Sequence, residues 1–554
     1  MKKIFLSTIV AIFVLGTLSP VEAAGTTVNF NLPSSRAIPK KINGVNQNFF
    51  VESFREYDSA TKKWVDKEYN FSRDAFDQTG TNLVRFPGGT VANYYNWETF
   101  APDWVAGEAI QQTHGNHVAW ITRYFDAFVG HLDPIFFIKT IQGKGKDVIL
   151  TLNVYSNTPE QIEIGLKKLK AANITVRYFE LGNEMYFYTP AQEYVNTSRR
   201  VALKIKSIYP NAQIGIVGNR SDWSGEQFDW EIPNADWFDA VIYHPYSGNG
   251  KQLQTEQLRI QYILFGIPEK ISSFIAKMRD KYPNKALWFT EWNLYEVTND
   301  GTIFYTDTYA YAAYHYNVLL TLLKYPKIAI ANHHTTWTRS PQFALLYAKK
   351  AINDSYYSKL VNPPNNVYSL DDFFVKSPAF WPFSWIGRAF NTYHKFTLVD
   401  NETVTSAYFF NADQPNQGSV AIINKTGVDQ TITLNGIGTQ SHTAFVLAKA
   451  WMEPNSEMNE MRPEERVMPG NTLTLAPYAI AYITPLTQIA SPAPTPAGKQ
   501  GDLNGDTKVD MLDYAILIAD FGKTGIPGWV PADIDKSGKV DVFDYNVLVG
   551  NFGK

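Results

Sequence analysis

The sequence predicts a multidomain protein: a (β/α)8 TIM barrel, a β-sandwich, and then a small all-α module at the C-terminus. Three observations support this fold class. Eight apolar, strand-like runs alternate with helical segments over residues 40–395. From residue 396 to 486 the runs become short, β-rich and separated by turn residues. Near the C-terminus, a helical segment and the acidic loop before it occur twice. A chain of 554 residues, 45% of them hydrophobic, can form several domains with large cores.

The first 23 residues have the organisation of a secretory signal peptide. A basic start, Met1-Lys2-Lys3, is followed by an apolar run over residues 4–18 and by the small-residue sequence Val21-Glu22-Ala23. The alternative is a membrane anchor, but about 15 apolar residues are fewer than the roughly 20 that a spanning helix needs. We therefore expect a signal peptide over residues 1–23 and no membrane span. The mature protein should be extracellular, either secreted or associated with the cell surface or a complex.

The charge, the cysteine count and the aromatic content of the chain limit the partners and the kind of protein that it can be. The formal net charge of -3 gives no electrostatic basis for binding nucleic acid or an anionic membrane. The chain has no Cys, so large cores or metal ions must supply the stability that disulfides give many exported domains. Aromatic residues make up 15% of the chain, which is typical of proteins with sugar-binding clefts.

The barrel prediction rests on the alternation of strand and helix. Stretches such as 160–172, 191–208 and 268–281 carry apolar residues at three- and four-residue spacing, as amphipathic helices do. No glycine-rich phosphate loop follows the first strand, which argues against a doubly wound sheet. The predicted barrel strands are 43–50, 83–87, 148–153, 176–181, 214–217, 241–243, 287–290 and 328–331.

The remaining segments define the other domains. The alternating strand within residues 24–39 precedes the barrel, and we expect it to join the β-sandwich of residues 396–486. Residues 487–500 form a Pro-rich linker, which separates the module of residues 501–554 from the rest.

The C-terminal module contains an internal repeat with calcium-ligand spacing. Residues 513–523 recur as residues 544–554, and each copy follows an oxygen-rich loop. The loop residues occupy positions 1, 3, 5, 7, 9 and 12 of an EF-hand-like site, where oxygen atoms converge on Ca²⁺. A solvated acidic surface would seldom repeat six positions in this way. The expected ligands are Asp502, Asn504, Asp506, Lys508, Asp510 and Asp513 in the first loop, and Asp533, Asp535, Ser537, Lys539, Asp541 and Asp544 in the second.

This duplicated loop and helix after a Pro-rich linker resembles a type I dockerin module. The resemblance implies docking to a cohesin domain on a scaffold or surface protein. Met511-Leu512 and Val542-Phe543 lie where the family reads its partner, and both pairs are apolar here. The sequence departs from the EF-hand pattern in having Asp at position 12 and Thr507 where the second loop has Gly538, so the first site is expected to be the weaker.

Two predicted barrel strands end in a carboxylate. Glu184 follows strand 176–181 and Glu291 follows strand 287–290. Active sites of (β/α)8 barrels form at the C-terminal ends of the strands, and strands four and seven lie on opposite sides of the barrel. The two carboxylates can therefore face each other at the roughly 5 Å separation that retaining glycosidases use.

These motifs resemble the clan of TIM-barrel retaining glycoside hydrolases, and most closely its α-L-arabinofuranosidase-like and related exo- or endo-acting members. The resemblance rests on Gly182-Asn183-Glu184, Thr290-Glu291-Trp292-Asn293, Leu83 to Gly89 around Arg85, His244-Pro245-Tyr246, and Trp337. It implies that Glu184 is the acid/base and Glu291 the nucleophile, with no cofactor for catalysis. It also implies that Arg85 and Tyr246 keep Glu291 ionised, that Asn183 bonds the sugar 2-hydroxyl, that His244 lines the subsite and that Trp337 stacks on the sugar.

Several residues have competing interpretations. Asn153 ends the third strand and is a candidate substrate-binding residue, while Glu180 is interpreted as a structural ion-pair partner of Arg85 or Arg177. Adjacent residues on a strand point to opposite faces, which argues against a metal site at His333 and His334. Tyr94, Tyr95 and Trp97 could form a sugar platform or pack in a loop core.

The function predicted from these observations is an exported retaining glycoside hydrolase, acting on plant cell-wall or similar polysaccharide and docked to a cohesin partner. The alternative is a catalytically inactive carbohydrate-binding or scaffold-associated protein on the same fold. The presence of both carboxylates together with Arg85 and Tyr246 favours the enzyme.

Overall fold

The computed structural model divides into two compact units, Met1–Pro485 and Leu486–Lys554. The predicted signal peptide and the linker 487–500 lie outside the described residues. The structure describes residues 24–47, 55–58, 63–66, 76–103, 105–107, 109–110, 134–221, 232–248, 250, 253–295, 305–338, 343–349, 374–486, 501–503, 508–523, 532–535, 537 and 539–553.

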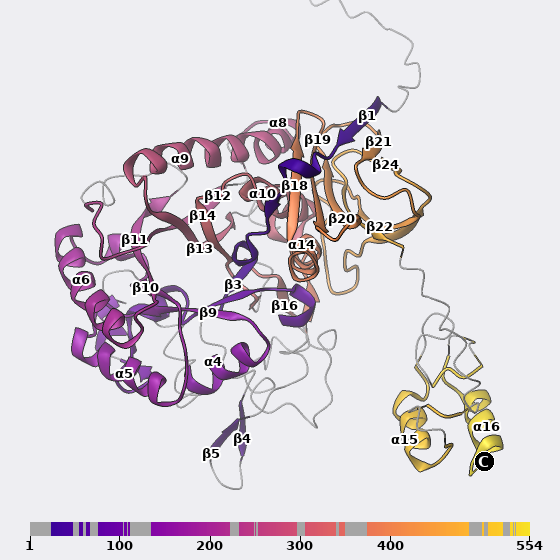
Figure 1. Cartoon of the computed structure of the whole chain (residues 1–554), viewed down its shortest axis with the longest axis horizontal. Helices are drawn as coiled ribbons and strands as arrows, with labels where there is room; N and C mark the ends of the chain where they lie inside the picture. The colour runs from indigo at the N-terminus through magenta and orange to yellow at the C-terminus, as the bar shows by residue number, and fades with distance from the viewer. Residues whose placement is uncertain are drawn as a thin grey trace, which may run out of the picture. The chain divides into compact units, whose positions relative to one another are not determined.

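Eight parallel strands close into a barrel in the larger unit, which confirms the predicted fold (Figure 1). Strands β12 and β13 run further than the apolar runs 241–243 and 287–290, because their polar ends still pair after a shift in register. Around the barrel the strands are β10 (Tyr178–Leu181), β11 (Gln213–Ser221), β12 (Ala240–Gly248), β13 (Ala286–Tyr295), β14 (Ile328–His333), β3 (Gly44–Asn46), β6 (Leu83–Phe86) and β9 (Asp147–Leu152).

The barrel interior changes from apolar to polar along the strands. One cluster of buried residues takes alternate positions at the start of the strands: Leu83, Ile149, Tyr178, Ile242, Trp288 and Ile330. Two residues further along the same strands the buried positions are polar: Arg85, Thr151, Glu180, His244, Thr290 and Asn332. Because side chains alternate along a strand, this second layer also points inward. The polar layer therefore forms the floor of a site at the C-terminal ends of the strands.

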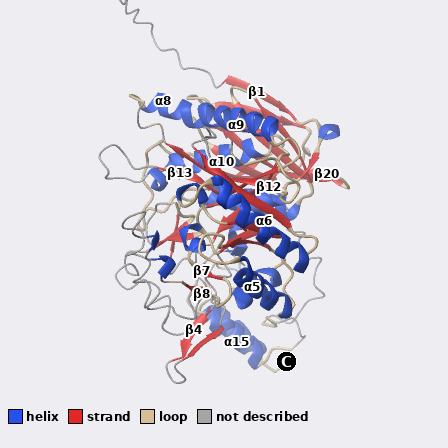
Figure 2. Ribbon diagram, turned by 90° about the vertical axis from the view of Figure 1, so that its left-hand side faces the viewer, coloured by secondary structure: helices blue, strands red, loops and turns tan. Residues whose placement is uncertain are grey.

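Helices cover the barrel on the outside, as Figure 2 shows for α6 and α9. Helix α5 begins with a capping box in which Thr158 and Gln161 bond each other's backbone N–H groups. Every residue of α10 is buried, because this helix lies against the β-sandwich as well as the barrel. The helices are α4 (Pro134–Gly143), α5 (Pro159–Ala171), α6 (Ala191–Ile208), α8 (Glu256–Gln261), α9 (Ile267–Lys281), α10 (Tyr309–Leu322) and α14 (Phe380–Thr392).

The β-sandwich follows the barrel and includes the N-terminal strand. Strand β1 (Ala24–Asn29) pairs in parallel with β21 (Gln430–Asn435), which in turn pairs with β24 (Thr472–Leu475). This small sheet shares one apolar core with a larger sheet, to which Val28 and Ile483 both contribute. In spatial order the larger sheet contains β2 (Arg36–Ala37), β18 (Lys395–Asp400), β19 (Val404–Asn411), β20 (Gln414–Asn424), β25 (Ile480–Pro485), β22 (His442–Leu447) and β23 (Glu464–Met468).

A partly buried carboxyl joins barrel and sandwich. Asp307, which precedes α10, lies close to Asn455 of the sandwich, and Asn455 Nδ2 also donates to the Tyr347 hydroxyl at 3.0 Å. Burial, only partly offset by the hydrogen bonds of Tyr347 and Asn455, raises the pKa of Asp307 to about 7. Between pH 4 and 7 the folded protein therefore retains a proton that the unfolded chain has lost, and stability falls as pH rises through this window.

We expect Asp307→Asn to stabilise the protein above pH 7, because it removes the cost of ionising a partly buried carboxyl. A shift of about 3 pKa units sets an upper limit of about 4 kcal/mol. Denaturant unfolding at pH 4 and pH 8 should show the gain at pH 8 and little difference at pH 4. Asp400→Asn is the matched control with the opposite sign, because Lys324 and Lys425 hold the pKa of Asp400 below its usual range. A gain in stability of equal size at pH 4 and pH 8 would contradict the raised pKa of Asp307.

The smaller unit is a pair of helices, α15 (Met511–Asp520) and α16 (Val542–Asn551). Each begins with the same capping box, in which Asp510 or Asp541 is the N-cap. Val509, Leu517, Ala532, Val540 and Leu548 form its buried core. Among the described residues of the whole chain, no helix is long and apolar enough to cross a membrane.

Candidate active site

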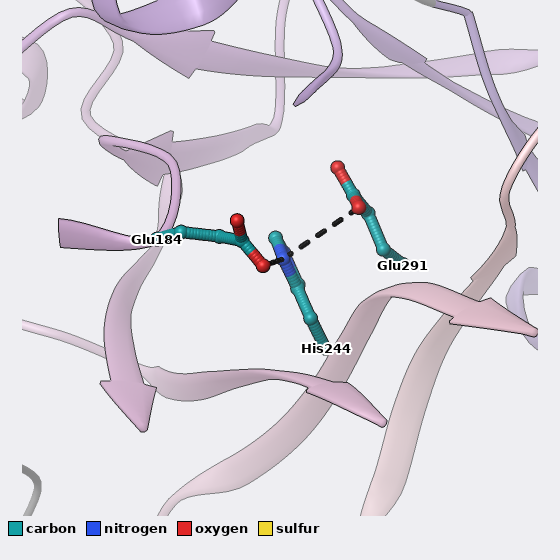
Figure 3. A group of neighbouring side chains, drawn as sticks. All are labelled: Glu184, His244 and Glu291. Carbon is teal, nitrogen blue, oxygen red and sulfur yellow. Dashed lines mark hydrogen bonds and ion pairs between the residues drawn. The ribbon is translucent and has the colours of Figure 1, made fainter. Parts of the chain in front are cut away.

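Glu184 and Glu291 both reach the mouth of the barrel, where they flank His244 (Figure 3). Strand β10 ends at Leu181, and Gly182 and Glu184 then adopt positive φ angles of 81° and 48°. A Cβ on Gly182 would lie 2.6 Å from Met185, so glycine is needed for this turn. The two carboxylates and the His244 ring each place a ligand atom within 4.8 Å of the other two.

An irregularity in β13 directs two successive side chains into the site. The register between β13 and β14 shifts between Phe289 and Trp292. Such a shift re-aims side chains that strict alternation would send to opposite faces. Thr290 Oγ1 donates to Glu180 at 3.1 Å, and the Glu291 carboxylate lies beside it in the mouth of the barrel.

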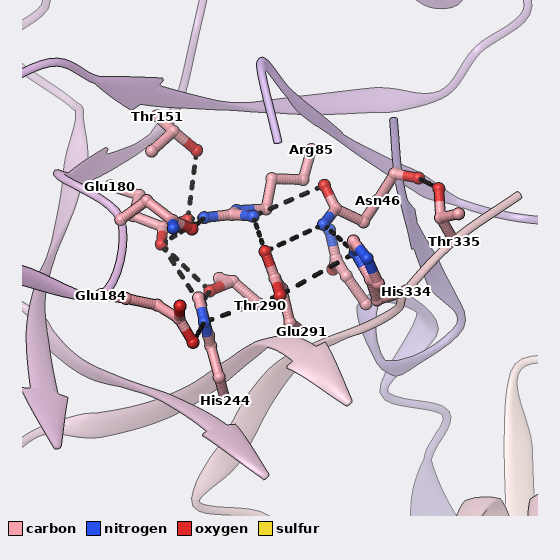
Figure 4. Close-up of polar contacts among 12 residues, drawn as sticks. Asn46, Arg85, Thr151, Glu180, Glu184, His244, Thr290, Glu291, His334 and Thr335 are labelled. Atoms are coloured by element: carbon pink, nitrogen blue, oxygen red, sulfur yellow. Dashed lines mark hydrogen bonds and ion pairs between the residues drawn. The ribbon is translucent and has the colours of Figure 1, made fainter. Parts of the chain in front are cut away.

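Glu291 is buried and accepts three hydrogen bonds (Figure 4). Arg85 Nη1 donates to Oε1 at 2.7 Å, and Asn46 Nδ2 donates to the same oxygen at 3.1 Å. The Tyr246 hydroxyl donates to Oε2 at 2.7 Å. This donor set stabilises the ionised form of the carboxylate.

Glu180 lies one layer deeper and is fully buried. Arg85 donates to it from Nε at 2.7 Å and from Nη2 at 2.8 Å, a bidentate ion pair that confirms the interpretation of Glu180 as the structural partner of Arg85. One guanidinium therefore connects Glu180 to Glu291. Burial would raise the pKa of Glu180, but the charges and hydrogen bonds of Arg85 and His244 together hold it below its usual range.

His244 lies between the carboxylates. Its Nδ1 is 3.3 Å from Glu184 Oε1 and 3.7 Å from Glu291 Oε2, while its Nε2 is 3.0 Å from Thr290 Oγ1. Burial alone would lower the pKa of His244, but Glu291, Glu180 and Glu184 raise it to about 9. Burial would raise the pKa of Glu291, but the charges of His244 and Arg85 lower it below its usual range.

Glu184 has a different environment. Its side chain is 24% exposed, against 6% for Glu291. The Tyr186 hydroxyl donates to its Oε1 at 2.8 Å. Next to it, Asn183 is held by Asn93, which accepts from the Asn183 N–H at 3.0 Å and donates to its carbonyl at 2.7 Å. Arg85 Nη2 donates to Asn183 Oδ1 at 2.8 Å, so the amide nitrogen is the end of this side chain that can donate to a ligand.

Other residues singled out in the sequence take different places. Asn153 is buried, and its amide donates to Tyr95 O, in the segment after β6, and to Ser156 Oγ, in the loop after β9. Trp337 lies in the short strand β15 (Trp337–Thr338), which pairs with β16 (Leu346–Ala348); its side chain is outside the described part. Tyr94, Tyr95 and Trp97 are fully buried, so they form loop core and not a sugar platform.

Sequence reasoning missed Asn46 and His334. Asn46 ends β3, and His334 follows β14 directly, so both stand at strand ends as the two carboxylates do. Asn46 Nδ2 lies 2.7 Å from His334 Nδ1, and that nitrogen is 3.8 Å from Glu291 Oε2. His333 points away from the site and contacts Asn293 and Tyr311, as the opposite-face argument predicts. Phe343 adds an aromatic wall, its ring centroid 5.7 Å from that of Tyr246.

The second loop of the C-terminal unit brings carboxylates together. Oxygen atoms of Asp533, Asp535 and Asp544 lie within 4.8 Å of one another. Asp544 accepts the backbone N–H groups of Asp535 and Asp541, and Asp513 is placed in the same way in the first loop, where it accepts from Leu503 and Asp510. Asn504 and Asp506 lie outside the described residues. Hard oxygen donors of this kind fit Ca²⁺.

Comparison with known proteins identifies the two units separately. Residues 500–552 match the dockerin type I domain family, so the smaller unit is a dockerin type I domain. No curated protein matches the chain at a significant level.

The larger unit has the fold of α-L-arabinofuranosidases. A family 51 enzyme from Bifidobacterium longum is 15% identical and has a TM-score of 0.59, covering 84% of this chain and 99% of its own. The α-L-arabinofuranosidase of Thermotoga maritima has the same identity and TM-score, with 83% and 99% covered. The enzyme of Xanthomonas axonopodis pv. citri is 14% identical with a TM-score of 0.58, covering 83% and 99%. At these identities the likeness shows the fold.

Proposed function

We propose that this protein is an exported retaining glycoside hydrolase that acts on plant cell-wall or similar polysaccharide. The observation that carries the proposal is the pair of carboxylates, Glu184 and Glu291, whose oxygens lie within 4.8 Å across the barrel mouth. Retaining glycosidases place their two carboxyl groups about 5–5.5 Å apart, and inverting enzymes about 6.5–9.5 Å. The short separation leaves no room for a water between carboxylate and sugar and therefore favours double displacement.

The two carboxylates have environments suited to different roles. Three hydrogen bonds and the charge of Arg85 keep Glu291 ionised, as a nucleophile requires. Glu184 is the more exposed and lies beside the left-handed turn after β10, where a leaving group can pass to solvent. We assign Glu291 as the nucleophile and Glu184 as the acid/base.

The first step transfers the sugar to the protein. A Glu291 oxygen attacks the anomeric carbon while Glu184 gives its proton to the glycosidic oxygen, so the bond to the leaving group breaks as the glycosyl ester forms. Asn183 donates from its amide nitrogen to the sugar 2-hydroxyl, and Arg85 fixes the orientation of that amide. His244 lines the subsite between the carboxylates.

The second step releases the sugar. Glu184, now ionised, takes a proton from water, and the resulting attack on the anomeric carbon frees Glu291. Tyr246 and Arg85 stabilise the departing carboxylate of Glu291. Two inversions give net retention of anomeric configuration. All proton and bond changes are accounted for by these two side chains, the substrate and water.

The fold suggests a substrate class. The neighbours include α-L-arabinofuranosidases and, at a TM-score of 0.51 and 13% identity, a bifunctional glucanase-xylanase from a metagenome library. We propose action on arabinose-bearing chains or on a glycan backbone. An inactive carbohydrate-binding role is disfavoured, because the residues that hold the nucleophile are all in bonding contact with it.

Glu184→Ala tests the proposed chemistry. Proton donation is worth about 10²–10⁴-fold when the leaving group is poor, so hydrolysis of a polysaccharide or unactivated glycoside should fall by that factor. With a dinitrophenyl glycoside the first step should fall much less. The wild-type chain should release sugar from at least one member of a polysaccharide panel. Binding without release would support the inactive alternative, and equal losses on both substrates would contradict the role of Glu184.

We further propose that the dockerin domain binds Ca²⁺ and captures a cohesin on a scaffold or surface protein. Asp533, Asp535 and Asp544 supply the oxygen atoms in the described part of the second loop. The exposed apolar pairs Met511-Leu512 and Val542-Phe543 lie at the start of the two helices. Because these apolar pairs directly follow the calcium loops, we expect cohesin binding to depend on the conformation that Ca²⁺ gives the loops.

Cohesin capture should require calcium and the apolar pairs. Removing Ca²⁺ with EDTA should abolish binding to a cohesin panel in surface plasmon resonance, and added Ca²⁺ should restore it. The double variant Leu512→Asp and Phe543→Asp should lose at least about 100-fold in affinity, because it places charge in both copies of an apolar interface. Glu291→Gly is the matched control and should bind as the wild type does. Capture that persists in EDTA would contradict the coupling.

A further inference from the structure

We propose that the mouth of the barrel also binds one divalent transition-metal ion of the zinc class, held by Glu184, His244 and Glu291, and that this ion blocks the site. The binding site stands on its own geometry. The inhibitory consequence rests on the proposed function, because the same carboxylates are assigned there as acid/base and nucleophile.

Two of the three distances between the ligand atoms are close to those of a tetrahedral site. His244 Nδ1 lies 3.3 Å from Glu184 Oε1 and 3.7 Å from Glu291 Oε2, and all three atoms fall within 4.8 Å of one another (Figure 3). Ligands on an ion with bonds of about 2.0–2.1 Å lie roughly 3.3 Å apart when the geometry is tetrahedral. Glu184 is the most exposed of the three and can rotate to shorten the remaining edge.

Each ligand is oriented by a hydrogen bond with a neighbour. His244 Nε2 lies 3.0 Å from Thr290 Oγ1, which donates to Glu180 at 3.1 Å. This arrangement keeps a proton on Nε2, so a metal ion that binds His244 replaces the proton on Nδ1, the atom that lies between the carboxylates. Histidine ligands of zinc are held in the same way by a hydrogen bond to their second nitrogen.

The two carboxylates are supported in the same manner. Tyr186 donates to Glu184 Oε1 at 2.8 Å, and Tyr246 donates to Glu291 Oε2 at 2.7 Å. Arg85 and Asn46 bond the other oxygen of Glu291, Oε1, so Oε2 is the atom turned toward His244. The site therefore has both a ligand set and the outer hydrogen bonds that fix it.

The donor set selects the class of ion. An imidazole nitrogen with two carboxylates suits Zn²⁺, Co²⁺ and related ions, whereas Ca²⁺ and Mg²⁺ prefer all-oxygen sites such as the dockerin loops. An ion bound here would neutralise both carboxylates and occupy the space between acid/base and nucleophile. Competitive inhibition follows, because substrate and ion need the same atoms.

The test uses the full chain in saturating Ca²⁺, so that the dockerin loops are occupied. Co²⁺ titrated alone should bind at one equivalent with a visible absorption band, and Zn²⁺ should displace it. His244→Phe and Glu291→Gln should each weaken Zn²⁺ binding by at least about 100-fold, and Thr290→Val, which removes the hydroxyl between His244 and Glu180 but no ligand atom, by roughly 10-fold. Two control variants should still bind one equivalent of Co²⁺. They are His394→Gln, at an exposed histidine of the β-sandwich region, and Asp535→Asn in the dockerin.

The outcomes separate this inference from the proposed function. Binding of one metal ion that is lost in His244→Phe and weakened in Thr290→Val supports the site. A Zn²⁺ inhibition constant equal to the Zn²⁺ dissociation constant supports the proposal that the ion blocks hydrolysis. Absence of binding in an active protein overturns the inference and leaves the hydrolase intact. Binding at the site in a protein that cleaves no glycoside overturns the proposed function alone. Binding that survives both ligand substitutions places the ion elsewhere and overturns the inference.

Discussion

Replacing Glu291 by Gly should reduce turnover of an activated aryl glycoside by at least about 10⁴-fold, the scale of loss when a catalytic nucleophile is removed. The side chain that attacks the anomeric carbon is absent in this variant, while Glu184 remains in place to assist the leaving group. Added azide can enter the space left by the carboxylate and should restore a measurable rate. Initial rates with and without azide provide the measurement.

The control for this variant addresses folding. Glu291 accepts from Arg85, Asn46 and Tyr246, so its loss leaves those donors without their carboxylate partner. Circular dichroism and cohesin capture should match the wild type if the barrel and the dockerin remain folded. Unimpaired hydrolysis in a folded Glu291→Gly protein would contradict the nucleophile assignment.

Replacing Arg85 by Met should have the largest effect on stability. Arg85 is fully buried and is the ion-pair partner of both Glu180 and Glu291. Removing one partner of a buried pair leaves uncompensated charge and costs about 3–5 kcal/mol. Denaturant unfolding should show this loss. The acidic limb of the kcat/KM profile should also move to higher pH, because the pKa of Glu291 loses one of the charges that lower it.

The double variant Arg85→Met with Glu180→Gln separates the two effects. Removing the Glu180 charge as well should recover part of the stability, because one of the two unpaired carboxylates is gone. Activity should stay low, since Glu291 and Asn183 still lack their hydrogen bonds from the guanidinium. A double variant that regains activity together with stability would show that Arg85 acts only on folding.

The sequence predicted the barrel and the carboxylate pair because each depends on a local pattern. Apolar runs followed by a polar residue mark strand ends, and the fold brings strand ends together. The layered interior explains why Glu180 and Glu184, four residues apart, have different places: one is in the polar floor of the barrel and the other follows the turn at Gly182. The dockerin repeat was equally visible, because its ligand spacing is a property of the chain alone.

The missed residues depend on tertiary structure. Asn46 lies in a predicted strand, and nothing in its neighbours shows that its amide reaches Glu291, which lies two strands away around the barrel. The direction of Glu291 depends on a register shift in β13, which no periodicity records. Asn153 ends a strand as a site residue would, but its amide donates to Tyr95 O, from the segment after β6, and to Ser156 in the loop that follows.

The stereochemistry of the reaction tests the central claim, that Glu291 forms a glycosyl ester in a retaining reaction, most directly. Proton NMR of the first product formed by the wild-type protein should show the anomeric configuration of the substrate, because two displacements occur at the same carbon. The azide product of Glu291→Gly should show the opposite configuration, because only one displacement remains. A first product of inverted configuration from the wild-type protein would contradict the account.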